Sequence, residues 1–265
     1  MAQVASAPIG STRRDRRAFD QMDGLGVFGP RAKGAVRPPG VVVVAEPVFY
    51  CFTHTRSPLS GVPQREYARP VTVEITCATP DRVPDLATLI GRAFSDDPMA
   101  LWPLHPDAAE EEVRLWFLWF DEMLAPLGML WEAGRGLGAA AWFPPGEDER
   151  FLEIDRAVRP RVASLTDDGA ARYAEFWDWI EAHSPDEPHW FLDHVAVAPE
   201  QRGKGVGSGL VRFGLDHARA DGVPAFLETA RPENVGLYEH LGFRVVLDEN
   251  APGAGPHIWF MRFDP

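Results

Sequence analysis

A glycine-rich turn is the part of the sequence best suited to chemistry. It reads Gln201-Arg-Gly-Lys-Gly-Val-Gly207 and joins the alternating apolar segment 190–197 to an amphipathic segment that extends to residue 220. Glycines let several backbone N–H groups converge without obstruction by side chains, and the N-terminus of a following helix adds about half a positive charge. The turn therefore predicts a binding site for an anion, and a pyrophosphate fits it best.

Two common phosphate motifs do not match this turn. In the dinucleotide pattern G-x-G-x-x-G, Ser208 stands where the third glycine belongs. In the P-loop pattern, Gly205 follows Lys204 where a hydroxyl is needed for magnesium. Lys204 is one of only two lysines in a chain that otherwise uses arginine. A lysine at this turn therefore suggests a contact with the phosphates, and the alternative is a solvated turn residue.

A second motif follows downstream, in the arrangement Asn234-x-x-x-Tyr238-x-x-x-Gly242-Phe243. Together with the turn, in which Gly205 and Gly207 fill the glycine positions of a Q-x-x-G-x-G loop, this motif resembles the acetyl-CoA site of the GNAT superfamily of N-acetyltransferases. The resemblance implies an α/β fold with a central mixed sheet flanked by helices. It places the pyrophosphate turn between the fourth strand and the following helix.

A narrower resemblance is to the puromycin N-acetyltransferase-like members of this superfamily. It is carried by residues 187–192, 223–229 and 238–243, and it extends over most of residues 71–265. It implies transfer of the acetyl group of acetyl-CoA to a primary amine of a small molecule, by direct attack in a ternary complex and without a metal. The acceptor could be an aminonucleoside-type antibiotic, which would make the protein an antibiotic-resistance enzyme.

The resemblance also assigns roles to residues of the cofactor site. Tyr238 would be the general acid for the departing thiolate, because a phenol is protonated at neutral pH; a packed core tyrosine is the alternative. Asn234 would bind pantetheine, with a helix N-cap as the alternative. Pantetheine would also pair with the backbone where the two central strands separate. The residues expected at the cofactor are Val195, Ala196 and Val197 for pantetheine, and Arg202, Gly203, Lys204, Gly205, Val206 and Gly207 for the pyrophosphate.

The group that accepts the amine's proton is left open by the sequence. Superfamily members often carry a carboxylate early in the fourth strand, but here that position is the apolar Trp190-Phe191. Asp193 and Glu228 are the available carboxylates, and either could be a structural ion-pair partner instead. His194 is a further candidate, although strand alternation places it on the opposite face from Asp193. A chain of water molecules would also suffice.

Alternating and helical spacings predict the elements that position these residues. Strands and helices alternate in the last third of the chain, so the sheet is expected to be mixed or mostly parallel. Seven of the nine tryptophans lie between residues 102 and 179, where most should pack in the core and one or two could line an acceptor pocket. We expect strands at 71–76, 129–133, 136–143, 190–197, 225–228, 243–247 and 258–263, and helices at 80–94, 107–124, from the turn to 220, and 233–241, with partly helical sequence before residue 180.

Composition narrows the range of partners. The net charge of −13 argues against nucleic acid, whose phosphates require clustered Lys and Arg, and it suits a cationic amine. The two cysteines have no metal-ligand spacing and predict neither a zinc site nor a disulfide framework. No apolar run approaches the roughly 18 residues that span a membrane. We therefore expect a cytoplasmic monomer or homodimer that binds neither a membrane nor nucleic acid.

Residues 1–70 differ in character from the rest of the chain. They are net basic and rich in Pro, Gly, Ser and Arg, whereas residues 71–265 are strongly acidic. Without a sustained period, this segment is expected to be a disordered extension, or sequence upstream of the true start. The acetyltransferase domain is assigned to residues 71–265.

Other functions remain compatible with the same motifs. A non-catalytic acetyl-CoA-binding regulator would keep the turn but lose the acid and the acceptor pocket. An acetyltransferase could instead act on a polyamine or a protein N-terminus. A nucleotide-binding module would need a magnesium-binding hydroxyl or a ribose-binding acid, and the sequence shows neither at the expected place.

Overall fold

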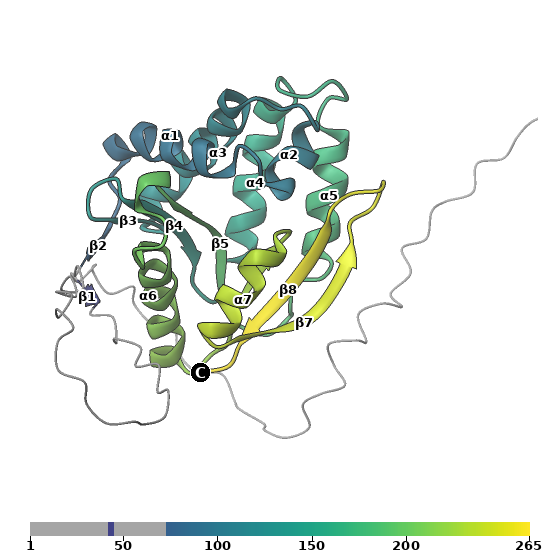
Figure 1. Ribbon diagram of the computed structural model, residues 1–265. Helices are drawn as coiled ribbons and strands as arrows, with labels where there is room; N and C mark the ends of the chain where they lie inside the picture. Colours follow the sequence, from purple (N-terminus) through teal and green to yellow (C-terminus); the bar gives the residue numbers. More distant parts are fainter. Residues whose placement is uncertain (1–41, 45–72) are drawn as a thin grey trace, which may run out of the picture.

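The computed structural model describes residues 42–44, as backbone only, and residues 73–265. Within these residues one eight-stranded sheet has the order β1-β2-β3-β4-β5-β6-β8-β7 (Figure 1). Among the described strands only β5 and β6 pair in parallel, so the predicted mixed sheet is confirmed and the alternative of a mostly parallel sheet is not. All other neighbouring strands of the sheet, including the hairpins β3–β4 and β7–β8, pair antiparallel. The strands are β1 (Val42–Val44), β2 (Val73–Cys77), β3 (Leu130–Ala133), β4 (Gly138–Phe143), β5 (Trp190–Val197), β6 (Ala225–Thr229), β7 (Phe243–Asn250) and β8 (His257–Phe263).

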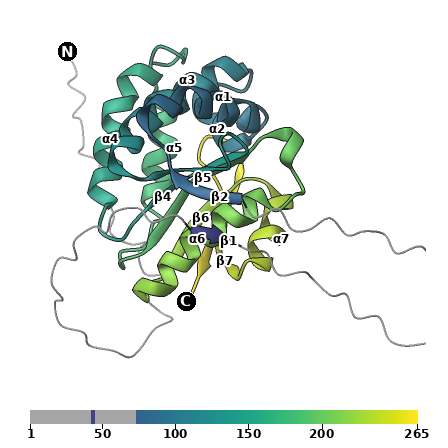
Figure 2. The same ribbon diagram turned by 90° about the vertical axis from the view of Figure 1, so that its left-hand side faces the viewer.

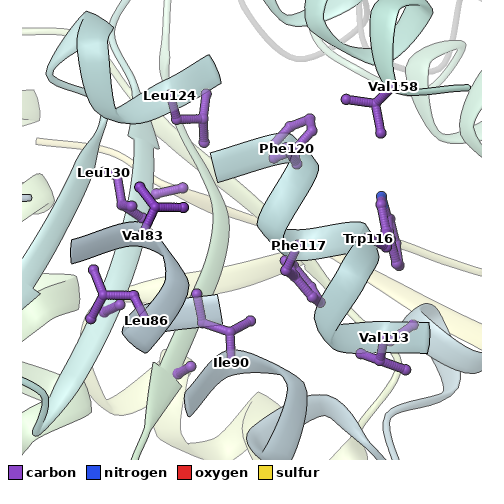
Figure 3. Close-up of a cluster of buried hydrophobic side chains, with 14 of the residues drawn as sticks. Val83, Leu86, Ile90, Val113, Trp116, Phe117, Phe120, Leu124, Leu130 and Val158 are labelled. Atoms are coloured by element: carbon purple, nitrogen blue, oxygen red, sulfur yellow. The ribbon is translucent and has the colours of Figure 1, made fainter. Parts of the chain in front are cut away.

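Helices cover both faces of this sheet (Figure 2). One layer holds α1 (Val83–Phe94), α2 (Pro98–Leu104), α3 (Glu110–Leu124), α4 (Asp148–Val162) and α5 (Ala171–Glu181). The other layer holds α6 (Val206–Asp221) and α7 (Pro232–His240). In the first layer the apolar faces of α1 and α3 oppose one another, with Leu86 and Ile90 near Phe117 (Figure 3). The spacing that predicted both helices thus produces their shared core.

Most predicted elements are confirmed within a few residues. The short helix α2 was not predicted; it has seven residues, begins at Pro98 and contains Pro103, and a proline inside a segment weakens any helical signal. Most of residues 1–70 lie outside the described residues, except that Val42–Val44 pairs antiparallel with β2. No helix in the described ranges is both long and apolar enough to cross a bilayer.

The central strands β5 and β6 separate after a short paired stretch. They pair only at Trp190 with Ala225 and at Phe191 with Phe226, and then diverge. On its other edge β5 pairs with β4 up to Val197. Alternate N–H and C=O groups of β5 beyond Phe191 therefore point into an opening instead of to a neighbouring strand. The predicted separation of the central strands is confirmed.

An extra residue in β5 changes which way its side chains point. Ala141 pairs with His194 and Trp142 with Leu192, so Asp193 has no partner in β4. This is a β-bulge, which shifts the alternation of the strand by one residue. Before the bulge Phe191 packs with the α3 layer, and after it the ring of His194 does.

The fit between the sheet and α6 depends on a glycine. A Cβ atom at Gly214 would lie 2.1 Å from Cε2 of the buried Trp142. We expect Gly214→Ala to lower the free energy of unfolding by about 2 kcal/mol, because neither the helix nor the indole can move freely. For a domain of this size that corresponds to a fall in Tm of roughly 4–8 °C.

The matched control is Gly209→Ala on the same helix, where an added Cβ meets no heavy atom within 4 Å. There the Tm should stay equal or rise, since alanine favours a helix by about 1 kcal/mol over glycine. Thermal unfolding followed by circular dichroism measures both variants. Equal effects of the two substitutions would contradict the proposed close packing.

Candidate active site

A cavity of about 820 Å³ opens where β5 and β6 separate. The glycine turn lies at one end, and helices of the α1–α5 layer enclose the other. Tyr238 and Asn234 reach it from α7, and Asp193 and Glu228 from the two central strands. The structure therefore brings all the residues predicted for acid, base and cofactor contacts to one cavity.

The glycine turn has the backbone geometry that an anion site needs. Gly203 and Gly205 have φ values of 74° and 85°, which residues with a Cβ rarely adopt. Helix α6 begins at Val206 with no side-chain cap, so its first N–H groups have no partner within the helix. Lys204 stays at the turn through a bond from Nζ to Oε1 of Gln201, at 3.2 Å.

A further glycine keeps the turn close to β5. A Cβ at Gly207 would lie 3.1 Å from Cγ2 of Val197. The turn, the start of α6 and the open edge of β5 are thus adjacent. Convergent N–H groups, a helix N-terminus and two basic side chains, Arg202 and Lys204, suit a pyrophosphate, and an open strand edge suits an extended amide chain.

Asn234 faces the cavity from the first turn of α7. Its Nδ2 donates to Oγ1 of Thr229 at 3.4 Å. The N-cap of α7 is Arg231, not Asn234, so the alternative of a capping role for Asn234 is wrong. The hydrogen bond to Thr229 instead ties α7 to the end of β6.

Tyr238 is buried but lines the cavity, with an exposed fraction of 7%. Burial raises the pKa of its hydroxyl, and the negative charge of Asp97 adds to the effect. The hydroxyl therefore stays protonated throughout the neutral pH range and can donate a hydrogen bond or a proton.

An ion-pair cluster connects α7 to the loop before α2. Oδ1 of Asp97 accepts from the N–H of Met99 at 2.9 Å, and its Oδ2 accepts from Nε of Arg231, also at 2.9 Å. Arg231 also pairs with Asp96 and Glu233. Burial raises the pKa of Asp97, although Met99 and Arg231 act against it. Sequence reasoning missed this cluster, since residues so far apart along the chain carry no local signal.

The far end of the cavity is aromatic. Trp116 contacts Phe117, Tyr173 and Trp177 with ring centroids 5.1 to 5.9 Å apart. Nε1 of Trp177 is buried and has no hydrogen-bond partner. Trp116 and Trp177 thus line the cavity, as predicted for one or two of the tryptophans. Trp142, in contrast, packs in the core, and its Nε1 donates to the carbonyl of Leu210 at 3.3 Å. The aromatic side chains at this end are Phe94, Trp116, Phe117, Phe120, Phe151, Tyr173 and Trp177.

Carboxylates stand between the aromatic end and the turn. Burial raises the pKa of Glu228 to about 8, with the charges of Asp193 and Glu181 adding to the shift. Asp193 and His194 lie on the same side of β5, because the bulge interrupts the alternation; the expectation of opposite faces is wrong. Their side chains are in contact, with Nδ1 of His194 at 2.7 Å from Oδ2 of Asp193.

Sequence reasoning also missed Asp121 on α3. Its side chain is fully buried, and its Oδ1 lies 3.5 Å from Nε2 of His194. Val113, Phe117 and Leu124 form an apolar stripe on this helix, and Asp121 lies on the same buried face. A carboxylate on such a stripe is the signal that could have identified it.

Within the described part of the chain, no cluster of His, Cys, Asp or Glu side chains could hold a metal ion. The cavity is built from aromatic rings, carboxylates, one buried phenol and the glycine turn.

Comparisons with known proteins agree with this arrangement. The model of the acetyltransferase (GNAT) family matches residues 91–243. An uncharacterized N-acetyltransferase of Schizosaccharomyces pombe is 27% identical over 170 residues, or 59% of this chain and 68% of that protein. A mycothiol acetyltransferase of Kocuria rhizophila is 26% identical over 228 residues, or 69% of this chain and 75% of that protein.

A solved structure from Corynebacterium glutamicum, described as histone acetyltransferase HPA2 and related acetyltransferase, is 28% identical. It covers 72% of this chain and 95% of its own, with a TM-score of 0.54. The matched family region contains the glycine turn, Tyr238 and both separated strands. The chain therefore belongs to the GNAT family of acetyltransferases and is an acetyl-transferring enzyme that uses acetyl-CoA as co-substrate.

Proposed function

We propose that this enzyme acetylates the primary amine of a small, hydrophobic cation that carries an aromatic group. The observation that supports this most directly is the layout of the cavity, which joins the glycine turn to an aromatic chamber with two carboxylates at its entrance. Aromatic walls bind planar apolar groups, and a nearby negative charge favours an ammonium group. An aminonucleoside-type antibiotic has both features and is one acceptor that fits.

In the proposed reaction the pyrophosphate of acetyl-CoA binds at Arg202–Gly207, and pantetheine extends along Val195–Val197 beside Asn234. A backbone N–H of β5 that faces the opening would stabilise the developing oxyanion. Tyr238 would donate a proton to the departing sulfur. Asp193 or Glu228 would take the proton of the ammonium group, so that the neutral amine can attack the thioester carbonyl.

The function is tested by thiol release from acetyl-CoA with a panel of amines. The panel contains puromycin, arylalkylamines, aminoglycosides, linear polyamines and peptides with free N-termini. Turnover should be highest with aromatic monoamines, since the chamber is lined by rings. Highest turnover with linear polyamines or peptides would overturn the proposed acceptor class, and tight CoA binding without any turnover would favour a regulator.

Replacing Tyr238 tests its role as the general acid. In Tyr238→Phe the ring packing remains but the donor is lost, so kcat should fall about 100-fold. The Kd for CoA and the Tm should change little, because the hydroxyl is not needed for either. Steady-state kinetics and calorimetry measure these quantities. Unchanged kcat would remove Tyr238 from the mechanism.

Replacing the basic residues of the turn tests the pyrophosphate site. Arg202→Ala and Lys204→Ala should each raise the Kd for CoA about 3- to 10-fold, because each removes a charge-assisted contact on an exposed loop. The effect should shrink at high salt. Arg219→Ala, at the other end of α6 and paired with Asp216, is the control and should leave the Kd unchanged.

A further inference from the structure

Three ionisable side chains connect the interior of the protein to the cavity. Asp121 on α3 lies 3.5 Å from Nε2 of His194, whose Nδ1 lies 2.7 Å from Oδ2 of Asp193. The side chains of Asp121, His194 and Asp193 are 0%, 1% and 11% exposed. Asp193 is therefore the end of this array that a bound substrate can touch.

The buried end of the array is unbalanced unless a proton is present. Both carboxylate oxygens of Asp121 and Nε2 of His194 lack a hydrogen-bond partner. A buried, ionised carboxylate without a partner is strongly destabilising. An imidazolium at His194, or a proton on Asp121 itself, would balance that charge.

The electrostatics of the array favour holding a proton near neutral pH. Burial raises the pKa of Asp121 to about 7; His194 opposes this shift and Asp193 adds to it. Burial disfavours a charge on His194, but Asp121 and Asp193 outweigh burial and raise its pKa. Asp121 and His194 therefore favour holding a proton between them near neutral pH.

Neighbouring elements hold the array in place. The ring of Phe117, on α3, packs edge-on against His194 with centroids 5.1 Å apart. The β-bulge turns Asp193 toward the same side as His194. The charge of Asp193 acts on two further ionisable groups, Glu228 of β6 and Tyr173 of α5. Tyr173 donates to Asp155 of α4, which is also paired with Arg159, and on α1 Arg92 pairs with Glu200 at the surface.

We propose that Asp193, His194 and Asp121 form the proton-accepting array of the acetyl transfer. Asp193 takes the proton of the acceptor ammonium and is the catalytic base. His194 and Asp121 are positioning residues: they orient the Asp193 carboxylate and balance the charge that changes on it. This assignment rests on the proposed acetyl transfer to an amine, and it chooses Asp193 over Glu228 as the base.

Protons and electron pairs balance over the proposed acetyl transfer. One proton passes from the ammonium group to Asp193, and the nitrogen lone pair then forms the C–N bond. The C–S bond breaks with its electron pair on sulfur, which takes the proton of Tyr238. The second proton of the nitrogen restores Tyr238, and Asp193 releases its proton to solvent. With His194 protonated between two carboxylates, the array changes from a net charge of −1 to 0 when Asp193 is protonated.

Opposite shifts in the pH profile test this arrangement. At saturating substrates, kcat should rise with pH as the array loses its proton. Asp121→Asn removes a negative charge that favours protonation, so the rise should move to lower pH by about one unit. His194→Gln removes a positive charge that opposes protonation of Asp193, so the rise should move to higher pH by a similar amount.

Asp193→Asn should lower kcat at least about 100-fold while the Kd for CoA stays unchanged. The matched control is Asp155→Asn, another buried aspartate, whose carboxylate is bound by Arg159 and Tyr173. It should leave the position of the pH rise unchanged. A merely structural role of Asp121 and His194 would lower kcat evenly at all pH values.

The proposed array is contradicted if Asp193→Asn keeps the kcat of the wild type. It is also contradicted if Glu228→Gln abolishes the rise of kcat with pH while Asp193→Asn does not. If the wild type turns over no amine, the proposed function fails, and NMR titration of the histidines still decides on the coupling. The His194 signal, assigned by its loss in His194→Gln, should titrate above the ordinary range and move to lower pH in Asp121→Asn. An unmoved His194 titration in Asp121→Asn would refute the array independently of activity.

Discussion

The short pairing between β5 and β6 is the constraint on which the site depends. Two strands that lie side by side in the middle of a sheet would normally satisfy each other's backbone groups along their whole length. Here pairing ends after two residue pairs, so the sheet contains its own cleft. The backbone of β5 becomes a binding edge, the glycine turn at its end becomes an anion site, and α7 is brought to the rim. No separate domain is needed to form the cavity.

The cavity also combines two electrostatic environments. The turn presents N–H groups and basic side chains, whereas the aromatic end is bordered by Asp193 and Glu228 and backed by Asp121. The anionic cofactor and the proposed cationic acceptor would thereby be attracted to opposite ends of one cavity. The reacting atoms would meet between them, beside Tyr238.

Much of the cofactor half could be predicted from the sequence, because its signals are local. The glycine turn, Asn234 and Tyr238 lie in short motifs with fixed spacing, and strand and helix periods identified the elements around them. The acceptor half of the site could be predicted less well from the sequence. The orientation of His194 depends on a bulge that only pairing with β4 reveals. The Asp97–Arg231 ion pair joins residues 134 positions apart, which no local pattern reports. Asp121 had a local signal, a carboxylate on an apolar stripe, but its partner could not be identified before the helix was placed on the strand.

The bulge gives Asp193 a position in β5 that pairing with β4 does not use. On the two sides of the bulge the layer-facing positions are out of phase: Phe191 and His194 face α3, whereas Leu192 and Val195 face the α6 layer. A substitution at Asp193 would alter chemistry and leave this phase intact. Deleting the residue would remove the bulge, because Leu192 and His194 already pair with the adjacent residues Trp142 and Ala141, and the side chains on either side would keep their layers. The extra residue is therefore not needed to keep β5 in register with β4, and its position can carry a functional side chain to the cavity.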